Sequence, residues 1–232
     1  MSTLGLVKRV GPVGGKLLQS NDAPMTMAGK ERVWRAESDK KQLCSMKKKH
    51  ITMRNILLVV DLQKDFIDGT LAVPDAGSVV PVINNVKGGF DRVYFTLDWH
   101  PVNHCSFKEF GGIWPAHCVQ HTAGASLPDS ALQGLDASKI RFVLKGFNPE
   151  KEEYGAFSRI DAAAQDLFEA GDTVVVCGIA AEYCVLETLK NLYALSQECG
   201  FAVKVFMEGT ARFSSYDTLL QFMHEAGIEE YR

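Results

Sequence analysis

The sequence has little that would tie it to a membrane or to an oxidising compartment. Its apolar runs all fall short of the ~20 residues that a membrane-spanning helix needs, and its start lacks the compact apolar core of a signal peptide. Its six cysteines form no CxxC pair and follow no regular spacing. That pattern is typical of a reduced intracellular enzyme rather than a disulfide scaffold. We therefore expect a cytoplasmic protein without a membrane partner.

Positive charge is scarce beyond the first fifty residues. Residues 1–50 carry 11 Lys and Arg against 4 Asp and Glu, whereas the other 182 residues carry 14 against 24. The larger part is therefore acidic, which argues against nucleic-acid binding. Residues 1–52 are predicted to be a basic, flexible N-terminal extension, and both an organelle-targeting peptide and an upstream extension of the reading frame fit them. Residues 53–232 are predicted to form a single domain.

Strand and helix patterns alternate from residue 54 onward. Short apolar runs typical of strands covered on both faces are NILLVVDL, RVYFTLD, KIRFVLKG, DTVVVCGIA and FAVKVFME. The segments with helical patterns are SVVPVINNVKGGF, FSRIDAAAQDLFEAG, EYCVLETLKNLYALSQECG and SSYDTLLQFMHEAG. This alternation predicts an α/β fold, namely a doubly wound, mainly parallel sheet with helices on both faces.

Four chemically useful residues stand at the ends of predicted strands: Asp61, Asp98, Lys145 and Cys184. Chemistry in such sheets collects beyond the carboxyl ends of the strands. A thiol attacks only as its thiolate, so Asp61 could accept the proton of Cys184 while Lys145 stabilises the negative charge. Each residue alone has a structural alternative, since a strand-end Asp often caps a turn and a buried Cys is usually inert packing. Their occurrence together favours a cysteine nucleophile.

Several motifs in order resemble those of the isochorismatase-like cysteine hydrolases, and among these the nicotinamidases. They are DLQKDF, TLDWHPVNHCSF, WPAHCV, LKGFNPEKEEYGAF and GIAAEYCV. The resemblance covers residues 54–232 and implies a catalytic triad of Asp61, Lys145 and Cys184. It also implies an oxyanion site made by the backbone N–H groups of Ala180 and Cys184, with a cis peptide bond between Ile179 and Ala180.

The stretch DWHPVNHCSFKEFGGIWPAHC is rich in potential metal ligands, with one Asp, one Glu and three His. Carboxylate and imidazole groups suit zinc, iron or manganese, whereas a polar loop without a metal is the alternative. The resemblance implies one divalent metal ion, zinc being favoured, bound by Asp98, His100 and His117. For a fourth protein ligand it leaves Glu109 and His104 as candidates, and Glu109 fits the alignment better.

The function that the resemblance implies is hydrolysis of nicotinamide to nicotinate and ammonia through a cysteine thioester, in NAD salvage. The residues that would wall the pyridine ring are Phe66, Trp114 and Tyr154. Self-association is a further expectation of the family. Two alternatives stay open: another hydrolase of this family acting on a carbamoyl or ureido amide, and a catalytically silent binding protein on the same fold.

Overall fold

A computed structural model of the chain describes residues 53–158 and 167–232. The predicted N-terminal extension lies outside the described residues, as does most of the predicted helix in FSRIDAAAQDLFEAG. Within the described part, every helix is too short or too polar to cross a bilayer.

The core of the fold is a six-stranded sheet in which every strand pair is parallel, with the order β3-β2-β1-β4-β5-β6. The strands are β1 (Asn55–Val60), β2 (Arg92–Asp98), β3 (Ile140–Lys145), β4 (Thr173–Gly178), β5 (Ala202–Thr210) and β6 (Glu229–Glu230). The predicted doubly wound fold is confirmed, because the chain builds outward from β1 to β3 and then returns to place β4 on the other side of β1.

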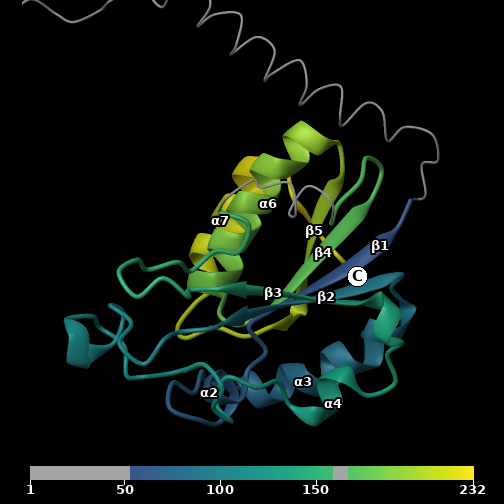
Figure 1. Cartoon of the computed structure of the whole chain (residues 1–232). Coiled ribbons are helices and arrows are strands. Elements are labelled where there is room, and N and C mark those ends of the chain that lie inside the picture. Colours follow the sequence, from purple (N-terminus) through teal and green to yellow (C-terminus); the bar gives the residue numbers. More distant parts are fainter. Residues whose placement is uncertain (1–52, 159–166) are drawn as a thin grey trace, which may run out of the picture. The chain divides into compact units, whose positions relative to one another are not determined.

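Helices cover both faces of this sheet (Figure 1). The helices α2 (Lys64–Ile67), α3 (Ala76–Val86) and α4 (Asp129–Leu132) lie on one face, and α6 (Leu186–Cys199) and α7 (Asp217–Ala226) on the other. Helix α3 buries Ala76, Val79 and Ile83, which lie on one side of the helix because of their spacing. Strands β1 and β4 are buried almost throughout, so the central strands are rigidly held.

The strand order places the site at a defined point. The chain reverses its direction of winding between β1 and β4, and the carboxyl ends of these strands open a crevice there. The segments that leave β1, β2, β3 and β4 at this edge contain all four strand-end residues singled out in the sequence.

Candidate active site

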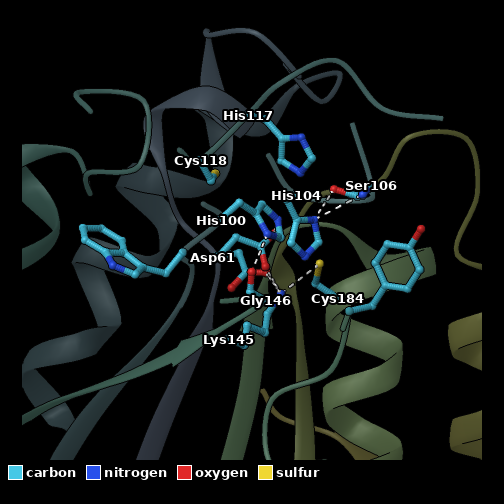
Figure 2. A network of polar contacts seen from close by, with 12 residues as sticks. Asp61, His100, His104, Ser106, His117, Cys118, Lys145, Gly146 and Cys184 are labelled. Atoms are coloured by element: carbon cyan, nitrogen blue, oxygen red, sulfur yellow. Dashed lines mark hydrogen bonds and ion pairs between the residues drawn. The ribbon is translucent and has the colours of Figure 1, made fainter. Parts of the chain in front are cut away.

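Three residues from distant parts of the chain meet at this edge of the sheet (Figure 2). Asp61 directly follows β1, Lys145 ends β3, and Cys184 lies in a π-helical turn, Ala181–Val185, after β4. The Lys145 Nζ is 2.7 Å from Asp61 Oδ2 and 3.5 Å from Cys184 Sγ. All three side chains are buried. The structure thus brings together the carboxylate, ammonium and sulfur that the sequence placed at three strand ends.

Asp61 is held so that one of its carboxylate oxygens stays available. Its backbone adopts a left-handed conformation with φ of 47°, and its N–H donates to the Thr96 backbone oxygen at 3.1 Å. The Thr96 hydroxyl donates to Asp61 Oδ1 at 2.6 Å. Among the described residues, Asp61 Oδ2 is the one buried side-chain N or O atom that receives no hydrogen bond in suitable geometry. That oxygen is instead paired with the Lys145 ammonium, and it is the Asp61 oxygen that remains to accept a proton.

The charges of the site explain why the thiol needs a base. Burial raises the pKa of the Cys184 thiol well above its usual value, although Lys145 opposes the shift. Burial likewise raises the pKa of Asp61, again against the effect of Lys145. Burial would lower the pKa of Lys145, but Asp61 and Asp98 outweigh it and raise that pKa. The resting site therefore holds a protonated thiol beside an ammonium group.

A second cluster consists of Asp98, His100 and His117, whose ligand atoms all lie within 4.8 Å of one another. The Nδ1 atoms of His100 and His117 lie 2.8 Å from the backbone oxygens of Gly146 and Pro115 respectively. Since a carbonyl oxygen only accepts, each Nδ1 carries a proton, and Nε2 is the ligand atom of each neutral ring. His100 Nε2 lies 3.5 Å from Asp98 Oδ2. A carboxylate and two imidazoles presented in this way fit a zinc, iron or manganese ion.

Gly146 makes room for this cluster. A Cβ atom at this position would lie 2.5 Å from His100 Cε1, and the backbone φ of 66° is one that other residues rarely adopt. A side chain here would displace the His100 ring, so the glycine that follows Lys145 helps to set the ring's position.

The structure leaves Glu109 outside the cluster of Asp98, His100 and His117. Its side chain is exposed on the 3-10 turn Lys108–Phe110, so Glu109 drops out of the set of ligands that we propose. His104 is fully buried, and its ring centroid is 4.1 Å from that of His100. Its two ring nitrogens, however, lie 2.7 Å from Ser106 Oγ and 3.1 Å from the Lys151 backbone oxygen. Neither candidate therefore offers a free ligand atom to the cluster.

A pocket opens over Cys184 and the cluster of Asp98, His100 and His117. All three aromatic residues predicted to wall the ring, namely Phe66, Trp114 and Tyr154, line this pocket. Four further residues that were not predicted from the sequence also line the pocket: Leu71, Glu152, Tyr183 and Phe213. Tyr183 and Glu152 stand within the quoted motifs, but only the fold shows that they face the pocket, and Phe213 had no signal beyond its aromatic character.

The turn before Cys184 offers a backbone donor to the same pocket. The Ile179–Ala180 peptide bond is cis, as the resemblance implied. Ala180 lines the pocket, and among the described residues its N–H donates to no backbone oxygen. An unpaired N–H beside a nucleophile is suited to stabilise an oxyanion.

Known proteins share this arrangement of sequence and fold. Residues 55–230 match the Isochorismatase domain family. A nicotinamidase of Acinetobacter baylyi is 36% identical over 57% of this chain and 71% of its own length. A nicotinamidase of Schizosaccharomyces pombe is 32% identical over 75% of this chain and 90% of its own length.

Solved structures agree with these relatives. PnC1 from L. infantum, in complex with nicotinate, superposes with a TM-score of 0.66 at 29% identity, over 77% of this chain and 92% of its own. A pyrazinamidase of Pyrococcus horikoshii in complex with zinc gives a TM-score of 0.61 at 32% identity, over 77% of this chain and 98% of its own.

Proposed function

The chain belongs to the isochorismatase domain family, and from that premise we propose that it is a nicotinamidase, which hydrolyses nicotinamide to nicotinate and ammonia in NAD salvage. The observation that carries the proposal is that the Asp61 carboxylate, the Lys145 ammonium and the Cys184 thiol lie together in one buried site beneath a pocket with aromatic walls. The named relatives and the complex with nicotinate support the choice of a pyridine carboxamide as substrate.

The first half of the reaction forms a thioester. Asp61 Oδ2 takes the proton of the Cys184 thiol, and the thiolate attacks the amide carbon of nicotinamide. The N–H groups of Ala180 and Cys184 stabilise the oxyanion that develops on the carbonyl oxygen. Asp61 then returns the proton to the amide nitrogen, the C–N bond breaks, and ammonia leaves.

The second half releases the product. Asp61, again ionised, takes a proton from water as the water oxygen attacks the thioester carbon, and the same N–H groups stabilise the second oxyanion. The C–S bond breaks, Cys184 regains a proton, and nicotinate leaves. Lys145 keeps its positive charge throughout and stabilises the thiolate and the Asp61 carboxylate in turn.

Asp98, His100 and His117 would hold one divalent metal ion, zinc being favoured over iron or manganese. When bound, the metal supplies a Lewis acid for the ring nitrogen of the substrate and so orients the amide carbon over Cys184. A cytoplasmic location and self-association stay predictions that accompany this proposal.

The test is ammonia release from nicotinamide by the purified protein, with an N-carbamoyl amino acid as the alternative amide. We expect turnover of nicotinamide only, its loss after treatment with a chelator, and its return when Zn²⁺, Fe²⁺ or Mn²⁺ is added back. Cys184→Ala should abolish turnover and leave metal binding intact. Turnover of the carbamoyl compound alone, or full activity of Cys184→Ala, would refute the proposed function.

A further inference from the structure

One wall of the pocket comes from the loop that follows β5. Phe213 lies in this loop and lines the pocket, although it is 29 residues away from Cys184 in sequence. Its ring stacks on that of Trp114 with centroids 5.8 Å apart and meets the ring of Tyr183 edge-on at the same distance. The three rings form a connected aromatic wall of the pocket, and Phe213 is the part of it that comes from the loop after β5.

The loop is fastened by a single carboxylate from the turn that carries the nucleophile. Glu182 Oε2 accepts a hydrogen bond from the N–H of Phe213 at 3.0 Å. Glu182 Oε1 accepts from the N–H groups of Ser214 at 2.6 Å and Ser215 at 2.9 Å, and from the Ser214 hydroxyl at 3.1 Å. Successive N–H groups that converge in this way form a concave anion site, which the Glu182 carboxylate fills.

The Glu182 carboxylate accepts from the backbone N–H groups of residues 213–215, whereas the ends of the loop have contacts of their own. The Tyr216 hydroxyl donates to the Thr210 backbone oxygen at 2.6 Å, and the Arg212 guanidinium lies over the Tyr216 ring. The first residue of the loop, Ala211, is fixed by two backbone hydrogen bonds: its oxygen accepts from the N–H of Ala181, and its N–H donates to the Gly178 oxygen. Beyond that point, among the described residues, the N–H groups of Phe213, Ser214 and Ser215 donate to no oxygen other than those of Glu182. Burial would raise the pKa of Glu182, but the N–H groups of Ser214 and Phe213 lower it, so Glu182 is ionised at neutral pH. We call the Glu182 carboxylate, together with the N–H groups of residues 213–215, the clamp.

We propose that Glu182 is a positioning residue for substrate binding: it holds Phe213 in the aromatic wall and thereby sets the KM for nicotinamide. Glu182 acts through Phe213 and not through the neighbouring Cys184. The inference rests on the proposed function for its substrate, whereas the clamp itself is a property of the fold. It assigns a role to a residue that neither touches the substrate nor belongs to the reacting groups.

The kinetic test compares Glu182→Ala, Glu182→Gln and Phe213→Ala with the wild-type protein. We expect Glu182→Ala and Phe213→Ala each to raise the KM by about threefold to tenfold with kcat little changed, as the loss of one aromatic contact implies. Glu182→Gln keeps an acceptor but loses the charge, so its KM should fall between those of the wild type and Glu182→Ala. Glu187→Ala is the matched control: this carboxylate follows on α6 but bonds Lys190 on the surface, so its KM should not change.

The double variant Glu182→Ala/Phe213→Ala shows whether Glu182 changes the KM through Phe213 or independently of it. If Glu182 acts through Phe213, the double variant should have the KM of Phe213→Ala alone. KM effects that multiply, or a fall in kcat at constant KM in Glu182→Ala, would overturn the inference, the second result pointing to an effect on Cys184 instead.

Hydrogen exchange separates this inference from the proposed function. In Glu182→Ala, the amides of Phe213, Ser214 and Ser215 should exchange faster, while in Glu187→Ala they should exchange as in the wild type. A wild-type protein inactive on nicotinamide refutes the function but leaves this measurement decisive for the clamp. Unchanged exchange at the three amides refutes the clamp whatever the substrate.

Discussion

In the proposed mechanism, proton transfer depends on a single oxygen atom, Asp61 Oδ2. The other oxygen, Oδ1, accepts from the Thr96 hydroxyl, and the Lys145 ammonium favours the charged form of the carboxylate although burial raises its pKa. Because burial raises the pKa of the Cys184 thiol, the sulfur stays protonated unless a base faces it. The base and the nucleophile are therefore one functional unit, and neither is sufficient alone.

Asp61→Asn should remove the base and change the shape of the site very little. We expect kcat to fall by about 100-fold or more, the usual contribution of general acid–base catalysis. Alkylation of Cys184 by iodoacetamide, followed by peptide mass spectrometry, should slow in parallel. Cys105 is partly exposed and outside the pocket, so its alkylation rate serves as the internal control. An unchanged alkylation rate at Cys184 in Asp61→Asn would show that another group takes the proton.

The residues of the site differed in how far the sequence could predict them. Asp61, Lys145 and Cys184 could be found because each stands where an apolar strand ends, and parallel strands bring such ends together. The hydrogen bond between Glu182 and Phe213 could not be predicted from the sequence, because it joins the turn after β4 to the loop after β5, with a helix and a strand between them. Glu109 was placed among the ligands from its alignment, yet it lies on an exposed turn whose direction no local pattern encodes.

At the scale of elements, β4 must pass very close to β1 for the nucleophile turn to form. Gly178 ends β4 with φ of 119°, and a Cβ atom there would lie 2.1 Å from the Val60 backbone oxygen. Backbone atoms in the centre of a sheet cannot move aside as a flexible side chain can. The glycine of the GIAAEYCV motif is therefore a structural requirement of the strand and not a part of the chemistry.

Gly178→Ala should therefore destabilise the fold by about 3 kcal/mol or more, from the unfavourable φ together with the steric overlap. The matched control is Gly77→Ala in α3, where a Cβ atom would meet nothing within 4 Å. That change should stabilise the protein by about 0.5–1 kcal/mol, because alanine favours a helix over glycine. Urea unfolding of both variants measures the difference, and a Gly178→Ala variant as stable as the wild type would contradict the close approach of β1 and β4.

The regular elements could be predicted well and the long loop could not. All five apolar runs predicted as strands are strands. Burial on both faces explains the continuous apolar sequence of β1, β2 and β4, whereas β3 keeps an apolar sequence although Phe142 and Leu144 are exposed. The segment between β2 and β3 has no regular pattern of apolar residues. It packs around buried polar groups whose hydrogen-bond partners lie in other parts of the chain, such as its own His104 and the Asp65 side chain from the segment after β1. Asp65 illustrates the problem, since it follows β1 but accepts from the N–H of Cys118, beside His117, a proposed metal ligand.

At the scale of the whole molecule, the excess of basic residues and the residues of the candidate active site lie in different parts of the chain. The basic excess lies in residues 1–50, whereas the acidic remainder contains the sheet and every residue that lines the pocket. The family match begins at residue 55, where β1 also begins. We therefore propose that residues 53–232 form the complete hydrolase domain and that residues 1–52 contribute nothing to turnover.

Removal of residues 1–52 should leave kcat, KM and the midpoint of urea unfolding unchanged. The reason is that the described core and the Asp61, Lys145 and Cys184 contacts involve only residues beyond this point. The truncated and full-length chains should be purified side by side and compared at equal metal content, because loss of metal would imitate loss of a functional segment. A truncated chain that binds metal normally but has a higher KM would show that the N-terminal segment takes part in the pocket, and one that unfolds at lower urea would extend the domain into residues 1–52.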